Sequence, residues 1–306
     1  MHRIDNSTAV AVMPTRKPVG TAGFFTQGSE PSGQLATIVE ADILNALMME
    51  IANVVTRAGI TLNKLDDTQL WTAINALITA ATRVTIDHQL FTSSATYTPN
   101  AKMLFCTVEM WGGGGGGGGA FGQPSPNVSA ATGGASGAYA MRLYSKADIG
   151  AGGAAVAIGA GGAAGPAGQN NGNAGGATAF ATTGTGGTMQ ANGGGGGQYG
   201  ITATTPTRGG FLASSPAAAG GHIMVPGTPG SWPLLFGGAA YAAISGSGGH
   251  APMFASGGGQ AAQEDANGNP GTYFGGGGAG GAATTVSRAG GVGFQGLCRV
   301  IEYCFG

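Results

Sequence analysis

The sequence has little charge. Only 8% of its 306 residues are Asp, Glu, Lys or Arg, and the formal net charge is -1. A protein that binds nucleic acid needs a clear excess of Lys and Arg to contact the phosphates, so we expect no nucleic-acid partner. No run of 18 apolar residues occurs, which argues against a transmembrane helix. The first fifteen residues include Arg3 and Asp5 and have no long apolar core, so they do not resemble a signal peptide.

Cysteine is scarce as well. Cys106, Cys298 and Cys304 form an odd set without a Cys-x-x-Cys motif, which argues against a secreted disulfide framework and against a structural zinc site. Free thiols in a protein assembled in a reducing cytosol are the simplest interpretation, and an interchain bridge at Cys304 is the alternative. The four histidines have no metal-binding spacing, so we expect no metal and no cofactor.

Glycine is the residue in excess, with 64 of 306 positions. Five glycines lie before Trp111 and 59 lie after it, including an unbroken run of eight at 112–119. Such a run is usually a flexible linker. The alternative is a bundle of extended left-handed helices with three residues per turn, joined by backbone hydrogen bonds. We favour the bundle, because glycine segments recur and are separated by pieces with Pro, aromatic residues and Asn.

The chain before the glycine-rich half divides in two. Residues 1–36 contain three prolines and four glycines and read as an extended arm without a core of its own. Residues 37–83 carry two helix signals: a capping box from Thr37 to Glu40 with a stop at Gly59, and a second box over Asp66–Gln69. Two short amphipathic helices cannot bury both apolar stripes alone. We therefore expect an antiparallel helical hairpin that self-associates as a trimerisation collar.

Alternation of apolar and polar residues then predicts strands. In 104–110, Leu104, Cys106, Val108 and Met110 share one face, and Leu297–Cys304 repeats this pattern at the end of the chain. Further strands are expected at Tyr139–Tyr144 and Ala154–Ile158. The predicted fold is mixed: the helical hairpin, then, within 84–306, a small antiparallel β-sandwich combined with a bundle of polyglycine II helices.

The order of motifs before residue 75 resembles the N-terminal region of tail fibre proteins of tailed bacteriophages. The motifs that carry this resemblance are Phe25–Gly28 through Pro31, 36–39, 44–47, 58–62 and 67–74. The second half is similar to the glycine-rich domain at the end of such fibres. Its matching segments are Val108–Gly112 into polyglycine, 134–139, 158–162, 175–180, 191–197 and 293–297.

The resemblance implies an elongated homotrimeric fibre in the virion tail, made in the host cytoplasm. The N-terminal arm would attach to tail or baseplate proteins of the phage. The glycine-rich tip would contact a bacterial surface receptor, which could be a pilus, an outer-membrane protein or a glycan. The expected function is non-catalytic adsorption to the host.

Three other functions stay open. A structural tail connector or baseplate-proximal fibre would have no direct receptor contact. A tailspike-type depolymerase would need paired carboxylates, and Asp148, Glu264 and Asp265 are the available acids. A cellular adhesin would need an export signal, and we find none. Asp265, Asn267 and Asn269 resemble the start of a calcium loop, but the glycine register is wrong and no Glu ends it.

Large side chains in the second half gather between the glycine segments. Binding surfaces favour Trp, Tyr and Arg on loops held by a rigid scaffold. The alternative is that these side chains cover the ends of the bundle or form trimer contacts. The candidate receptor contacts are Arg208, Phe211, His222, Trp232, Tyr241 and Tyr273.

Overall fold

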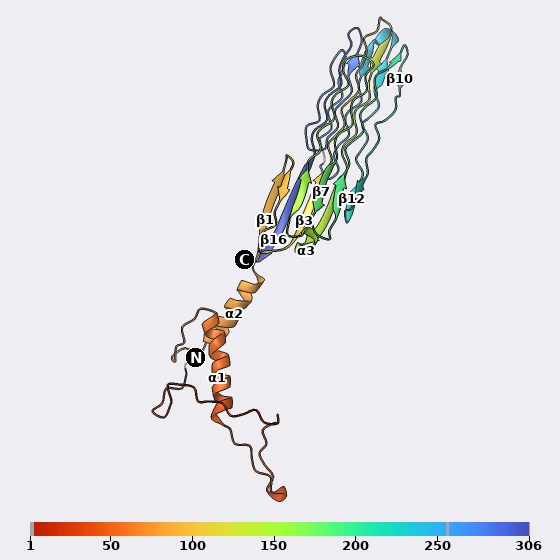
Figure 1. The fold of residues 1–306 in the computed structure, drawn as a ribbon. Helices are drawn as coiled ribbons and strands as arrows, with labels where there is room; N and C mark the ends of the chain where they lie inside the picture. Colours follow the sequence, from red (N-terminus) through yellow and green to blue (C-terminus); the bar gives the residue numbers. More distant parts are fainter. Residues whose placement is uncertain (1–2, 255–256, 306) are drawn as a thin grey trace. The chain divides into compact units, whose positions relative to one another are not determined.

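The computed structural model describes residues 3–254 and 257–305. It separates into two compact units, the first ending at Arg83 and the second spanning Val84–Phe305 (Figure 1). We call them unit 1 and unit 2. None of the helices in the described part of the chain is long and apolar enough to cross a membrane.

Unit 1 contains a short 3-10 helix and two α-helices. They are η1 (Glu30–Ser32), α1 (Ala41–Arg57) and α2 (Gln69–Thr82). The helices contact each other, and their buried residues include Ala52, Val55 and Ala73. Gly59 follows α1 with φ of +77°, which confirms it as the helix stop.

The two predicted capping boxes do not form. Helix α1 begins at Ala41, directly after the last residue of the first box. Glu40 is its N-cap residue and makes no side-chain cap. The hydroxyl of Thr37 accepts the amide of Thr26 at 3.0 Å instead, so an arm residue takes the group that the box requires. Before α2, Asp66 accepts the amide and hydroxyl of Thr68, which closes a local turn and leaves the helix N-terminus without a side-chain cap.

Both helices leave apolar side chains uncovered. Trp71 exposes 68% of its surface, and five further apolar residues of the two helices expose between 39% and 57%. Those five are Leu44, Leu47, Ile74, Leu77 and Ile78. One copy of unit 1 therefore presents an apolar surface on its helices.

Unit 2 begins and ends in the same five-stranded antiparallel sheet, which we call the first sheet. Its order is β1 (Val84–Phe91), β16 (Leu297–Phe305), β3 (Met103–Trp111), β5 (Tyr139–Ser145) and β12 (Ile223–Val225). The strands predicted at 104–110, 139–144 and 297–304 are thus confirmed. In β3 the predicted face is confirmed at Cys106, Val108 and Met110, which are completely buried.

A second five-stranded sheet shares this core. Its order is β11 (Ala218–Ala219), β8 (Thr188–Ala191), β7 (Thr178–Thr182), β6 (Ala154–Ala157) and β2 (Ala95–Tyr97). Phe180 and Met189 from the second sheet and Tyr144 from the first are among the buried residues of one cluster. The helix α3 (Lys146–Ile149) follows β5 and adds Ile149 to the cluster.

Two three-stranded sheets lie at the other end of unit 2, where Figure 1 labels β10. One has the order β10 (Thr207–Arg208), β13 (Leu234–Phe236) and β14 (Ala242–Ile244), with the 3-10 helix η2 (Gly238–Ala240) before β14. The other has the order β15 (Ala282–Ala283), β4 (Val128–Ala130) and β9 (Ile201–Ala203). They share a small core that includes Val128 and Leu235.

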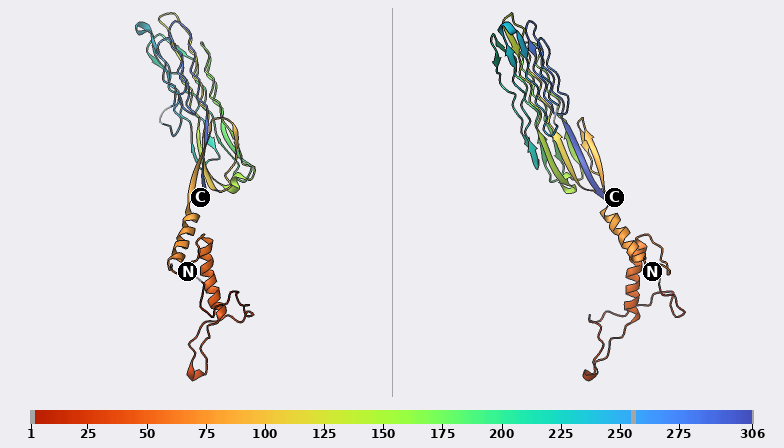
Figure 2. Two further views of the ribbon diagram at one scale, coloured as in Figure 1. Left: turned by 90° about the vertical axis from the view of Figure 1, so that its left-hand side faces the viewer. Right: turned by 180° about the vertical axis from the view of Figure 1, so that it is seen from behind.

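The glycine segments connect the two ends of unit 2 and run side by side along it (Figure 2). The run from Gly112 to Ala120 is central to them. Its amides donate in turn to three neighbouring segments, 132–138, 170–176 and 288–294, and the partner repeats every third residue. Its carbonyls accept from three further segments, 162–168, 194–200 and 278–281. Six segments therefore surround the run through backbone hydrogen bonds.

Glycine is required in this run by the spacing of the backbones. A Cβ atom placed on any residue from Gly112 to Gly119 would lie 1.9–2.2 Å from a carbonyl oxygen of a neighbouring segment. Real Cβ atoms essentially never come closer than 3.0 Å. All residues of the run are buried. The interior of this region is therefore made of hydrogen-bonded backbone, and the run is not a flexible linker.

Candidate functional site

The six candidate contacts lie at three separate places in unit 2. Arg208, Phe211, Trp232 and Tyr241 belong to the strands and loops around β10, β13 and β14. His222 lies beside β12 in the first sheet, and Tyr273 lies in an aromatic cluster near Trp111. The structure therefore does not unite the six into one site. It brings Arg208 and Trp232 into direct contact.

Strand pairing creates the contact between Arg208 and Trp232. In the antiparallel pair β10–β13, Arg208 lies opposite Leu234, two residues after Trp232. The guanidinium carbon of Arg208 lies 4.5 Å from the centre of the Trp232 ring. This cation–π contact contributes about 0.5–1 kcal/mol at an exposed site. With Gly209 and Gly210, the pair lines an open hollow of about 260 Å³.

The Arg208 guanidinium has unused hydrogen-bond donors. Among the described residues, its assigned interaction is with the Trp232 ring, and no hydrogen bond or ion pair joins it to another side chain. A guanidinium carries five N–H donors in a plane, a geometry that matches carboxylate and phosphate groups. The contact thus holds a cation in place with its donors available to a ligand.

Phe211 and Tyr241 differ in their surroundings, although both lie near this pair in the sequence. Phe211 exposes 83% of its surface in the loop after β10. Tyr241 is half-buried against the small core, and its hydroxyl donates to the carbonyl of Gln123 at 3.2 Å. Its φ of +41° is in the left-handed region. Tyr241 therefore has a structural role in closing the small core, and its hydroxyl is already occupied.

His222 is held by the edge of the first sheet. Its amide donates to the carbonyl of Met141 at 2.8 Å, and its Nδ1 accepts the amide of Leu143 at 3.4 Å. This edge lies at the end of unit 2 away from β10 (Figure 1). The structure therefore places His222 and Arg208 at different ends of unit 2.

Tyr273 belongs to an aromatic group that lines a hollow of about 330 Å³. Its ring lies 5.9 Å from Phe254, which stacks on Trp111 at 4.7 Å. The Trp111 indole is fixed by a 2.8 Å hydrogen bond to the carbonyl of Pro252. Met253, which we did not select from the sequence, exposes 71% of its surface here at a φ of +66°. Its signal in the sequence is an apolar pair directly after a proline.

Two of the three candidate acids of a depolymerase, Asp148 and Asp265, are engaged in local hydrogen bonds, whereas the side chain of Glu264 is exposed. Asp148 forms a capping box with Ser145, the N-cap residue of α3. Hydrogen bonds from the side chain and backbone of Ser145 lower the pKa of the Asp148 carboxyl. Burial alone raises the pKa of Asp265, but hydrogen bonds from Thr284 and two following residues outweigh it and hold the pKa at about 2. The Thr284 amide donates to Asp265 at 2.7 Å. Both carboxylates stay ionised at neutral pH, which does not suit a general acid.

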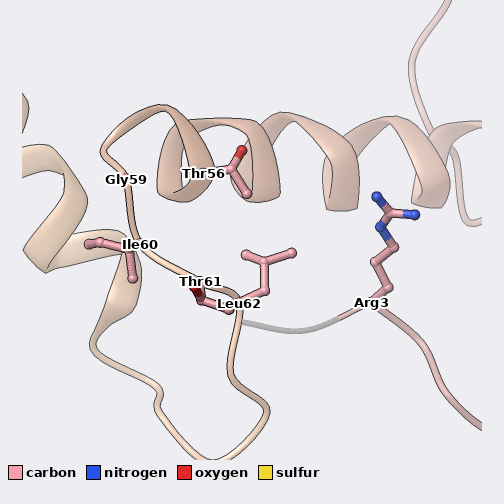
Figure 3. A pocket seen from close by; sticks show the side chains of 6 residues that line it. All are labelled: Arg3, Thr56, Gly59, Ile60, Thr61 and Leu62. Atoms are coloured by element: carbon pink, nitrogen blue, oxygen red, sulfur yellow. The ribbon is translucent and has the colours of Figure 1, made fainter.

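Unit 1 has a hollow of about 550 Å³ beside the end of α1 (Figure 3). Arg3 faces Leu62 across it, and Thr56 and Ile60 also line it. None of the candidate contacts lies there. Across the described residues, no group of three His, Cys, Asp or Glu side chains could hold a metal ion.

The extent of the glycine-rich part is matched by a known family. The family described as "Glycine-rich domain" matches residues 90–303, from the end of β1 to the end of β16. The chain belongs to the glycine-rich domain family. No curated protein matches the chain. In this chain the glycine-rich domain comprises the four sheets and the hydrogen-bonded glycine segments, and it carries all six candidate contacts.

Proposed function

We propose that this chain is a bacteriophage tail fibre protein whose glycine-rich domain mediates non-catalytic adsorption to the bacterial surface. The observation that carries the proposal is the exposed pair Arg208–Trp232 at one end of unit 2, in which Arg208 lies on β10 and Trp232 lies two residues before β13. Binding sites are commonly loops positioned by a rigid scaffold. The hydrogen-bonded glycine segments supply such a scaffold.

The finer fold of this scaffold is also a proposal. We infer that the glycine segments are polyglycine II helices packed in a bundle. Support comes from the change of hydrogen-bond partner at each residue and its return at every third residue along 112–120. A helix with three residues per turn directs successive amides to three sides, which accounts for this repeat.

The chemistry of the pair favours a ligand with a carboxylate or phosphate group. The Arg208 guanidinium can form two parallel hydrogen bonds to such a group, while its contact with the Trp232 ring fixes the orientation of the guanidinium. Phe211, which is 83% exposed in the adjoining loop, offers an apolar contact. Several weak contacts of this kind gain strength when a fibre presents several copies.

The virion assignment extends this proposal to unit 1. We propose a homotrimer in which the uncovered apolar side chains of α1 and α2 meet between copies. The arm before α1 would attach the fibre to phage tail or baseplate proteins, which would place the protein in the virion tail. The resemblance of the motifs between Phe25 and Ile74 to those of tail fibre proteins supports this part.

A competition experiment tests the function. Purified full-length protein is added to host cells before infection, and phage adsorption is measured. We expect the wild-type protein to reduce phage adsorption. Trp232→Ala and Arg208→Ala should each need at least a tenfold higher concentration for the same reduction. Arg83→Ala is the matched control, because Arg83 is exposed and lies outside unit 2.

Two outcomes would overturn the proposal. Folded wild-type protein that leaves adsorption unchanged would favour the structural connector over receptor binding. Full competition by both variants would remove Arg208 and Trp232 from the contact surface. Thermal melting of each variant distinguishes loss of contact from loss of fold.

A further inference from the structure

The first sheet has one face that the rest of unit 2 covers only at the end near Trp111, where Ala251 and Phe254 pack against it. Its inner face packs in the core, with Cys106, Val108 and Val300 completely buried. On the opposite face of the same sheet, seven large apolar residues expose between 38% and 59% of their surface. They are Val84, Ile86, Leu90, Phe105, Leu143, Ile223 and Phe305. We call the face that carries them the outer face.

Strand register makes these residues one continuous patch. Across β1, β16 and β3, Ile86 lies opposite Tyr303, which lies opposite Phe105. The rings of Phe105 and Tyr303 stack with their centres 4.6 Å apart. Leu143 follows on β5, and Ile223 on β12 faces Met141. Alternate residues of neighbouring strands point to the same side, so the patch crosses all five strands.

The second sheet provides the comparison. Its outward residues are small or polar, and those of β6 and β7 are all alanines. Ala155 and Ala157 are exposed there, and Gln190 and Thr188 continue the same side on β8. This composition is ordinary for a face in contact with water. Large apolar side chains therefore occur on one outer face of the sandwich and not on the other.

Charge on the outer face is balanced within the face itself. The Arg299 guanidinium pairs with the Glu109 carboxylate, and the Tyr139 hydroxyl donates to the same carboxylate at 2.9 Å. Arg299 and Glu109 lie opposite each other on β16 and β3. A charged partner would gain little from such a surface. A partner surface that is equally apolar and uncharged would fit it.

We propose that the outer face of the first sheet is the interface through which copies of this chain join along unit 2. This inference rests on the proposed homotrimer and names its contact surface in the glycine-rich domain. In a closed symmetric assembly every copy presents the same face, so apolar side chains meet apolar side chains. Seven half-exposed side chains of this size amount to several hundred Å², at the upper limit for patches on a monomer. The assembly would also cover the edge of the sheet at β1, which could otherwise pair with other chains.

Thiol labelling of the full-length protein tests this interface. The native cysteines are all buried, so an introduced surface cysteine is the accessible one. We compare Leu143→Cys and Ile86→Cys on the outer face with Ala155→Cys, an exposed strand position on the second sheet. A maleimide coupled to a bulky polymer should label the first two at least tenfold more slowly than Ala155→Cys. The mass in solution is measured by light scattering for each variant.

The outcomes separate this inference from the proposals on which it rests. A trimeric mass with slow labelling at both outer-face positions supports the interface. A trimeric mass with equal labelling rates at all three positions would overturn it and leave the trimer to unit 1 alone. A folded monomer with equal rates would overturn both the interface and the homotrimer. Neither result changes the adsorption competition, which reports on Arg208 and Trp232.

Discussion

The hydroxyl of Tyr97 donates a 2.6 Å hydrogen bond to the carboxylate of Glu302, 205 positions away in the chain, and both residues are completely buried. The bond links β2 of the second sheet to β16 of the first. The amide of Asn100 also points to this carboxylate, at 3.3 Å. Burial, followed by the bond to Glu302, raises the pKa of Tyr97 far above its usual value, so the phenol keeps its proton.

Tyr97→Phe should therefore destabilise unit 2. Removing the hydroxyl leaves a buried carboxylate short of a donor, at a cost of roughly 1–3 kcal/mol in the free energy of unfolding. Urea unfolding followed by near-ultraviolet circular dichroism measures the change. Tyr303→Phe is the matched control, because Tyr303 lies on the outer face of β16 and is partly exposed. An equal effect of both variants would show that the bond to Glu302 has no special weight.

Gly115→Ala should destabilise unit 2 through steric overlap. The new Cβ would lie 2.1 Å from the carbonyl oxygen of Gly195, and backbone on that side cannot rotate away as a side chain can. Overpacking of this kind costs about 1–3 kcal/mol or more. Gly23→Ala is the control, because no atom lies within 4 Å of the corresponding Cβ position. If the melting temperature changed equally little for both variants, close packing of the glycine segments would be refuted.

Asp265 should make stability depend on acid pH. Its pKa of about 2 in the folded protein is below the value of roughly 3.9 in an unfolded chain. Its contribution is therefore complete above pH 4 and lost as pH falls toward 2. For a half-buried carboxylate this contribution is on the order of 1–2 kcal/mol.

Asp265→Asn is the variant that checks this dependence. Its melting temperature should lie below that of the wild type at pH 7, and the difference should narrow between pH 4 and pH 2. Glu264→Gln, which changes the exposed neighbouring acid, is the matched control. A difference that stayed constant down to pH 2 would contradict the assigned titration.

The three cysteines should be inert in the folded protein. Burial raises the pKa of Cys106 to about 11 and also raises the pKa of Cys298 and Cys304. A thiol reagent at pH 8 should react fully in urea and at least tenfold more slowly without it. Gel electrophoresis without reductant should reveal no covalent dimer. A bridged dimer would instead support the alternative that Cys304 joins two chains.

Side-chain alternation made part of the fold predictable. The pattern at 104–110 and at Leu297–Cys304 predicted both strands, and at 104–110 it also predicted the buried side, because successive side chains of a strand point to opposite sides. The helices were predicted in place, but their capping boxes were not formed. Thr37 bonds to Thr26 from the arm, a partner that no local pattern contains.

The candidate site was less predictable for the same kind of reason. Arg208 and Trp232 were both selected from the sequence, yet their contact depends on β10 and β13, which pair over two residues. So short a strand has too little alternation to predict its partner. Tyr241 and His222 were selected as large side chains that lie between glycine segments. Their hydrogen bonds to Gln123 and Leu143 come from segments distant in the chain.

By itself the sequence determined that this chain has a glycine-rich half that could pack through its backbone, framed by strands at 104–110 and 297–304. The tertiary structure decided which segments surround Gly112–Gly119. The physical reason is that glycine has no side chain. Its freedom from Cβ atoms allows close packing on every side, but one glycine segment is chemically the same as the next. The choice among neighbours therefore depends on the sheets and loops that hold the ends of each segment in place.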